Sequence, residues 1–133
     1  GAAQHAKGCN VSSLAPAQPT LCTLEGVWTN QLKSLAILYT RGPSNGYATF
    51  SGRYVSKVST AAQPHVATGI ISGAQHLLNQ KTFGFSVLWL QTGHTTVWTG
   101  QCFVNERGEE ELRTVWLLRA PVKDQEENWS ATR

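Results

Sequence analysis

The chain has 133 residues, the length of a single domain. Charged residues make up 14% of it and the formal net charge is +3, values that exclude a disordered charged tail and do not support nucleic-acid binding. No run of 18 apolar residues occurs, so no membrane-spanning helix is predicted. Five tryptophans are many for this length, and tryptophan concentrates in binding sites and interfaces.

The predicted elements are short strands. Residues 1–21 are rich in Ala, Gln, Pro and Ser and contain no intact signal peptide, so we expect a flexible lead-in that begins a mature chain. From Cys22 onward, residue types alternate with period two, which is typical of strands. Turn-forming residues separate them, as at 41–46 and 105–108. Strands are predicted over 22–32, 34–40, 47–58, 65–73, 82–91, 94–104 and 109–119, with a last one from Trp129 to Arg133.

Strands of this length joined by short turns predict an antiparallel all-β domain over 22–133. Because no long helix interrupts the series, we expect an eight-stranded up-and-down β-barrel with its last strand truncated. A barrel of eight strands leaves room for one small ligand. The truncated strand is expected to leave the seam against the first and seventh strands half unpaired.

One face of the predicted strands combines tryptophans with polar side chains, which is unusual for a plain core. The tryptophans are Trp28, Trp89, Trp98 and Trp116. The polar residues are Asn30, Tyr54, Ser56, Thr92 and Thr96. A buried hydroxyl or amide without a partner costs about 1–3 kcal/mol, so a barrel would not collect five of them for stability alone. Aromatic walls with a few placed polar groups predict a ligand pocket instead.

The cysteines and glycosylation sequons favour a secreted protein. Cys9, Cys22 and Cys102 form no CxxC motif, and no metal-ligand spacing is present, so we expect no metal site. The odd number of cysteines suggests one disulfide and one remaining thiol. Asn10 and Asn128 each begin a sequon and are candidate glycosylation sites.

Five segments of the chain resemble the avidin family. They occur in order, with similar spacing, at 26–30, 83–89, 95–103, 115–119 and 128–133. The resemblance spans 22–133 and implies a secreted, homotetrameric β-barrel that binds biotin with high affinity and without catalysis. Biotin is then a bound ligand rather than a catalytic cofactor. The resemblance also implies a disulfide between Cys22 and Cys102, which leaves Cys9 to be capped or to link to another chain.

The resemblance implies polar contacts to the head group of biotin. Asn30, Ser34 and Tyr54 match the family's three donors to the ureido oxygen. Ser56 matches a hydroxyl that accepts from one ureido N–H. Thr96 matches the residue near the thioether sulfur. Converging donors in a dry pocket polarise a carbonyl without reorganisation, which is the physical reason for this arrangement.

The resemblance also implies an aromatic box, in which Trp89, Trp98 and Trp116 surround the bicyclic ring. Trp129 matches the residue that each subunit lends to its neighbour's pocket. Because the Asn128 sequon adjoins this contact, we expect glycan at Asn10 if at either site. The family's last strand also carries an acceptor for the second ureido N–H, and no residue of this sequence matches it.

The tail of biotin is expected to lie under a loop over residues 59–63, which includes Ser59 and Thr60. Thr92 and His94 stand where the family often has serines that hold the carboxylate. An imidazole can take this role, more strongly when protonated, or His94 can be a solvated hairpin residue. The segment 60–62 also offers fewer side-chain donors than the family pattern.

Two other interpretations remain open at the level of sequence. Gly26 and Trp28 also resemble the first motif of lipocalins, carriers of small hydrophobic ligands, although no C-terminal helix is predicted here. Residues 42–46 fit the G-x-S-x-G pattern of a nucleophile elbow, which requires a strand-to-helix turn. Since a hairpin loop is predicted there, we do not expect an enzyme.

Overall fold

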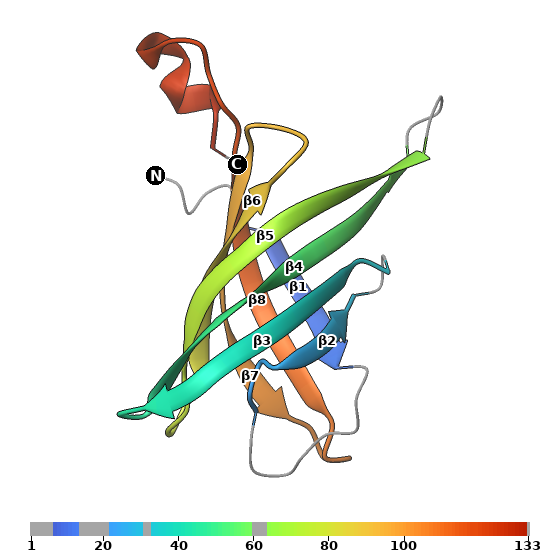
Figure 1. The fold of residues 1–133 in the computed structure, drawn as a ribbon, viewed down its shortest axis with the longest axis vertical. Coiled ribbons are helices and arrows are strands. Elements are labelled where there is room, and N and C mark those ends of the chain that lie inside the picture. Colours follow the sequence, from blue (N-terminus) through green and yellow to red (C-terminus); the bar gives the residue numbers. More distant parts are fainter. Residues whose placement is uncertain (1–6, 14–21, 31–32, 60–63, 133) are drawn as a thin grey trace.

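The structure, a computed structural model, describes residues 7–13, 22–30, 33–59 and 64–132. Eight antiparallel strands close into an up-and-down barrel in chain order (Figure 1), which confirms the predicted all-β barrel. The strands are β1 (Lys7–Ser13), β2 (Gly26–Thr29), β3 (Leu35–Ser44), β4 (Tyr47–Ser59), β5 (Pro64–His76), β6 (Thr82–Trp89), β7 (Thr95–Val104) and β8 (Glu110–Arg119).

The N-terminal strand β1 completes the barrel wall. It pairs with β8 from Lys7 to Ser12, and it pairs with β2 through Ser12 and Ser13. The lead-in predicted over 1–21 is therefore wrong for residues 7–13, and the seam expected to be half unpaired is filled by this strand. The physical reason is that an unpaired edge leaves backbone N–H and C=O groups without ladder partners, and β1 supplies them.

A 3₁₀-helix, η2 (Gln125–Ser130), occupies the place where a strand was predicted to start at Trp129. The Asp124 side chain caps it by accepting a hydrogen bond from the backbone N–H of Glu127 at 3.2 Å. Figure 1 shows this helix in red, beyond one end of the barrel. In the part of the chain that the structure describes, no helix is long and apolar enough to cross a membrane.

The turn between β3 and β4 is tighter than the sequence predicted. Asn45 and Gly46 have φ angles of 51° and 84°, as a two-residue hairpin turn of type I′ requires. The register between β3 and β4 shifts between Arg41 and Ser44, so β3 continues through an irregularity into the turn. Residues 42–46 therefore lie in a β-hairpin, which is not the strand-to-helix turn of a nucleophile elbow.

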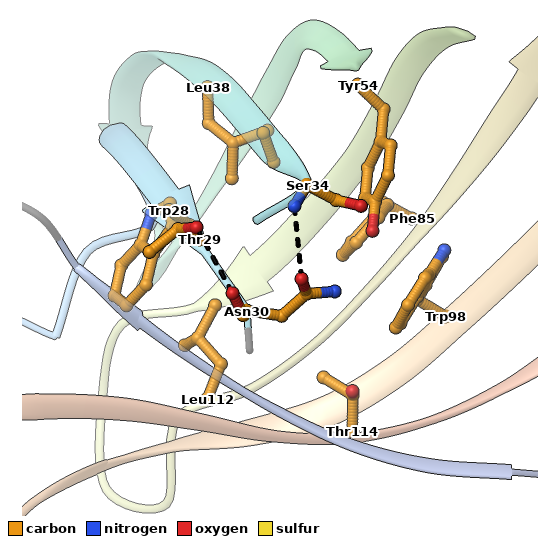
Figure 2. Close-up of a pocket in the computed structure, with 11 residues that line it drawn as sticks. Trp28, Thr29, Asn30, Ser34, Leu38, Tyr54, Phe85, Trp98, Leu112 and Thr114 are labelled. Atoms are coloured by element: carbon orange, nitrogen blue, oxygen red, sulfur yellow. Dashed lines mark hydrogen bonds between the residues drawn. The ribbon is translucent and has the colours of Figure 1, made fainter. Parts of the chain in front are cut away.

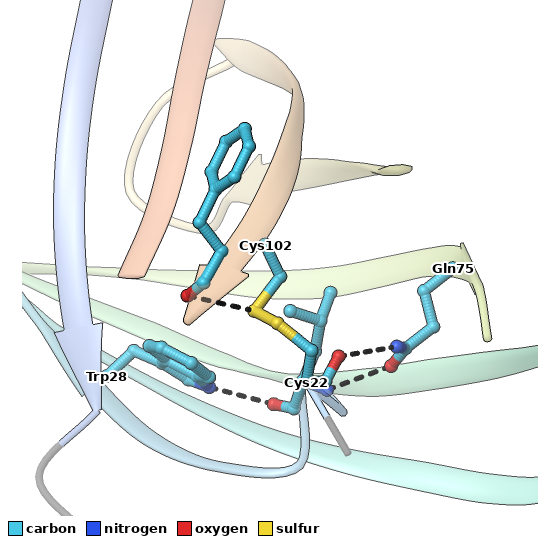
Figure 3. Close-up of a disulfide and its surroundings, with 6 residues drawn as sticks. Cys22, Trp28, Gln75 and Cys102 are labelled. Carbon is cyan, nitrogen blue, oxygen red and sulfur yellow. Dashed lines mark hydrogen bonds between the residues drawn. A yellow bond between two sulfur atoms is a disulfide. The ribbon is translucent and has the colours of Figure 1, made fainter. Parts of the chain in front are cut away.

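The segment that precedes β2 is fixed inside the barrel by a disulfide and three hydrogen bonds (Figure 3). Cys22 is bonded to Cys102, which confirms the predicted pair, with Cα atoms 5.9 Å apart. The fully buried Leu24 donates its N–H to Gln75 Oε1 at 2.9 Å and accepts from the indole N–H of Trp28 at 2.9 Å. The Gln75 amide also donates to the Cys22 carbonyl at 3.4 Å. These contacts fix the start of β2 against β5 and β7.

Glycines of β5 allow aromatic rings of β4 and β6 to meet across that strand. The register places Gly69 opposite Tyr54 on one side and opposite Trp89 on the other. The two ring centroids lie 5.4 Å apart in an edge-to-face arrangement. A Cβ at position 69 would lie 3.3 Å from Trp89 Cε3 and closer still to Val87. A side chain here would therefore push the ring contact apart.

Gly73, four residues further along β5, has the same role, and this leads to a test of stability. A Cβ at 73 would lie 2.7 Å from Phe50 Cζ and would also collide with Phe85 Cβ. We expect Gly73→Ala to lower the free energy of unfolding by about 1–3 kcal/mol in urea denaturation. The control is Gly84→Ala, whose Cβ would meet only ordinary contact, 3.5 Å from the Trp98 carbonyl oxygen. Equal losses in both variants would contradict this account of the packing.

Candidate ligand-binding site

A cavity lies inside the barrel, between residues of six strands and the β2–β3 connection (Figure 2). It contains about 410 Å³ of space free of atoms, part of which is open to solvent. Apolar and aromatic walls with a few polar groups are typical of small-molecule sites. The lining residues are Trp28, Thr29, Asn30, Ser34, Ala36, Leu38, Tyr54, Phe85, Trp98, Leu112 and Thr114.

Polar side chains gather where the chain turns from β2 into β3. Asn30 Oδ1 accepts a hydrogen bond from the Ser34 backbone N–H at 3.2 Å, and the Asn30 carbonyl accepts from the Lys33 N–H at 2.9 Å. This fixes the amide, with its nitrogen on the side of Trp98 in Figure 2. Ser34 is buried, and its hydroxyl donates to Ser56 Oγ at 3.4 Å. Three residues predicted for the site are thus brought together.

Aromatic rings form another wall. Trp98 lies nearly parallel to Phe85, with centroids 5.8 Å apart and planes at 13°, and to Tyr54, at 6.0 Å and 27°. Trp116 packs against Trp98 with ring centroids 5.7 Å apart and ring planes at 35°. Trp89 and Tyr54 form an edge-to-face pair. Such ring pairs are worth about 0.5–1.5 kcal/mol each beyond the area they bury. The predicted aromatic residues therefore form one contiguous cluster.

The predicted residues at the β6–β7 end make contacts with one another. The indole N–H of Trp89 donates to Thr96 Oγ1 at 2.8 Å, and Thr96 is buried. The backbone N–H of His94 donates to Thr92 Oγ1 at 3.1 Å. His94 Nδ1 is buried and has no hydrogen-bond partner among the residues that the structure describes. None of these four residues is among those that line the cavity.

The remaining predicted residues lie apart from this cluster. Trp129 is in η2 and is 90% exposed, and the exposed Asn128 precedes it. Asn10 lies in β1, opposite Arg113 of β8. Ser59 ends β4. Thr60 lies outside the described residues, as does the rest of the predicted loop up to Gln63.

Several lining residues were not assigned to the site from the sequence. Thr29, Ala36 and Leu38 come from β2 and β3, and they carry no chemistry that marks a ligand contact. The alternation of the strands could have found others, because Phe85 shares a face with Trp89, and residues 112 and 114 share a face with Trp116. The lining residues that this alternation could have found are Phe85, Leu112 and Thr114.

The comparison with protein families agrees with this architecture. The model of the avidin family matches residues 18–133. The chain belongs to the avidin family. Strand β1 (Lys7–Ser13) precedes the matched residues, so the strand that closes this barrel comes from outside the part of the chain that matches the avidin family.

Individual avidin relatives are similar over most of their length. Avidin of Gallus gallus is 42% identical over 128 residues, which are 91% of this chain and 82% of that protein. Avidin-related protein 4/5 of Gallus gallus is 41% identical over 127 residues, which are 91% of this chain and 81% of that protein. The crystal structure of Xenavidin superposes with a TM-score of 0.70 at 40% identity, covering 85% of this chain and 92% of that one. The structure of a biotin binding protein from chicken superposes with a TM-score of 0.70 at 41% identity, covering 84% of this chain and 89% of that one.

Proposed function

We propose that this avidin-family chain binds biotin in the barrel cavity, without catalysis. The observation that carries the proposal is the grouping of Asn30, Ser34 and Tyr54 around one cavity whose other wall is a stacked aromatic cluster. One structural relative, at 41% identity, is described as a biotin binding protein from chicken.

The polar group suits a cyclic urea. The Asn30 amide, the Ser34 hydroxyl and the Tyr54 hydroxyl are donors that can converge on one carbonyl oxygen. Without ligand, the Ser34 hydroxyl donates to Ser56 over a long 3.4 Å. When a ureido oxygen takes that hydrogen, Ser56 Oγ is able to accept from a ureido N–H. The two serines would thus exchange a weak mutual bond for two bonds to the ligand.

The aromatic cluster suits the bicyclic ring and thioether. In this proposal Trp89, Trp98 and Trp116 pack on the ring system. Thr96 accepts from the Trp89 indole, so its own hydroxyl hydrogen is available in the direction of the sulfur. Thr92 and His94, with Thr60 and with Ser59 at the end of β4, would lie at the carboxylate end of the ligand.

The donor role of Tyr54 is tested by Tyr54→Phe, which keeps the ring and removes the hydroxyl. We expect biotin to dissociate about 10–100 times faster, since a hydrogen bond in a dry site is worth about 1.5–3 kcal/mol. Tyr39→Phe is the matched control, because Tyr39 is 59% exposed on β3. A Tyr54→Phe variant with the wild-type dissociation rate, measured by displacement with excess biotin, would argue against this placement.

We further propose a homotetramer in which Trp129 covers a neighbour's ligand. The support is that Trp129 is 90% exposed in the isolated chain, an uncommon state for an indole and one that contact with a partner removes. We expect Trp129→Lys to weaken biotin binding and to shift tetramers toward dimers in analytical ultracentrifugation, whereas Trp129→Phe keeps both properties largely intact. A Trp129→Lys variant that remains tetrameric and binds normally would rule out the shared pocket.

Secretion is part of the same proposal. The Cys22–Cys102 disulfide is of a kind that persists in oxidising compartments. Mass spectrometry of secreted material will show whether Asn10 or Asn128 carries glycan.

A further inference from the structure

The acidic and basic residues of this chain are separated along the sequence. None of its 8 Asp and Glu residues lies between Gly26 and Asn105, whereas five of its 11 Lys and Arg residues do. These five are Lys33, Arg41, Arg53, Lys57 and Lys81. The formal net charge of +3 therefore understates the positive charge of the part of the chain that forms β2 to β7.

The strand order turns this separation in sequence into a separation in space. In the closed barrel, β8 lies opposite β4, with three strands between them in either direction. β8 and the turn before it contain four of the acidic residues, and η2 with its cap, beyond one end of the barrel in Figure 1, contains three more. The remaining one, Glu25, immediately precedes β2 and forms no ion pair with a described residue.

Two arginines lie on the outer side of β3 and β4. We define the β3–β4 face by five exposed residues, Tyr39, Arg41, Thr49, Ser51 and Arg53. The register places Tyr39 opposite Ser51 and Arg41 opposite Thr49. Arg53 follows Thr49 by four residues on the same side of β4, about 13 Å further along the strand. The two cations thus stand apart along one line of the barrel wall, with Tyr39 between them.

Neither arginine of the β3–β4 face is neutralised by an acidic side chain. Among the described residues, the ion pairs join Arg107 to Glu109 and Arg113 to Glu111, each at 3.8 Å. The charges of Arg41 and Arg53 are therefore available to an external anion. A guanidinium group binds a sulfate or phosphate group through two parallel hydrogen bonds.

Contact between copies of the chain is not expected to cover this face. Exposed aliphatic residues lie on the other side of the barrel, on β5 to β8, and include Ile70, Leu88, Val97 and Val115. Because association buries apolar surface most favourably, the proposed tetramer would use those strands. The β3–β4 face, with its unpaired arginines, would remain in solvent.

We propose that the β3–β4 face binds a linear sulfated polysaccharide of the extracellular space. Its sulfate groups complement the arginines in charge, and counterion release favours binding. The choice of a polysaccharide over a nucleic acid rests on the proposed secretion. It also rests on the shape of the face, because the side of a barrel wall does not enter a DNA groove as a helix or a two-stranded ribbon does. Binding of biotin is not required for this interaction.

A heparin oligosaccharide and the whole chain provide the test. We expect binding at about 0.15 M NaCl with a Kd on the order of 10 μM. The Arg41→Gln, Arg53→Gln variant should bind about tenfold more weakly, because two exposed charge pairs are lost. The slope of log Kd against the logarithm of the NaCl concentration should fall by about 2, one for each cation removed. Since both side chains are exposed, the urea midpoint should not change.

The matched control is Arg107→Gln, Arg113→Gln, which also removes two positive charges, but from arginines paired with Glu109 and Glu111. Because salt screens charges beyond about 8 Å, we expect its affinity for heparin to stay within about twofold of the unmodified chain. Equal losses in the two variants would show that net charge alone attracts heparin, and would overturn the proposal. Failure of the unmodified chain to bind heparin would also overturn it.

Other polyanions decide the class of partner. Desulfated heparin should not bind, and double-stranded DNA and vesicles of phosphatidylserine and phosphatidylcholine should bind more weakly than heparin at the same salt concentration. If DNA or vesicles bind as tightly as heparin, and lose as much affinity in the Arg41→Gln, Arg53→Gln variant, the choice of a polysaccharide is wrong. A biotin titration of the same samples is independent of these results, so the proposed function and this inference can fail separately.

Discussion

Deletion of residues 1–13 should lower the free energy of unfolding by about 5 kcal/mol, because β1 is one of the strands that close the barrel. It pairs with β8 at six positions and with β2 at two. Each ladder hydrogen bond contributes about 1 kcal/mol net, and its loss exposes the edges of both neighbouring strands. Since domains have about 5–15 kcal/mol in total, we expect partial opening and aggregation. Urea denaturation and light scattering measure both effects.

The matched control for this deletion removes only residues 1–6 and keeps β1. We expect its urea midpoint to equal that of the whole chain. If the chain without residues 1–13 has the same midpoint and stays monodisperse, β1 does not close the barrel in solution.

Removal of the Cys22–Cys102 disulfide has an expected effect of similar size. The two cysteines are 80 residues apart in the sequence. Cross-linking a loop of that length lowers the conformational entropy of the unfolded chain, which raises the free energy of unfolding by about 4.5 kcal/mol. Both side chains are buried, so alanine is a better replacement than serine. We expect the Cys22→Ala, Cys102→Ala variant to unfold at a much lower urea concentration.

Reductant supplies the control for the disulfide. Dithiothreitol should lower the midpoint of the unmodified chain to near that of the double alanine variant, and it should leave the variant itself unchanged. A double variant as stable as the oxidised chain would show that the bond adds little to folding.

The strands from β3 to β8 follow from the alternation of residue types, because the inward positions of a barrel wall are apolar and the period of a strand is two. The structure of the two ends of the chain, β1 and the residues after β8, does not follow from this alternation. The segment of β1, KGCNVSS, alternates between apolar and polar residues only over the four residues 9–12, which is too short a pattern to predict a strand by itself. Its strand conformation comes from the edges that it pairs with, a tertiary effect. The residues after β8 form η2 because Asp124 caps them locally.

The candidate site was predicted best where a residue carries chemistry. Asn30, Ser34, Tyr54 and Trp98 were assigned from the sequence and all line the cavity. Apolar lining residues such as Leu38 look the same in a plain core, so sequence patterns cannot separate them from it. The indole N–H of Trp98 has no hydrogen-bond partner among the described residues, and this could not be predicted either, because it depends on how distant strands pack around the ring.

The most direct test of the central claim is a titration of the chain with biotin, in which tryptophan fluorescence is the signal that is measured. The account predicts a saturable change that reaches its plateau at one biotin per chain, with a Kd below about 1 μM, because the proposed site would place the ligand beside the indoles of the aromatic cluster. Lipoic acid, which has a sulfur ring and the same carboxylate tail but no ureido group, should give no such change. Fluorescence that is unaffected by biotin, or equally affected by lipoic acid, would contradict the account.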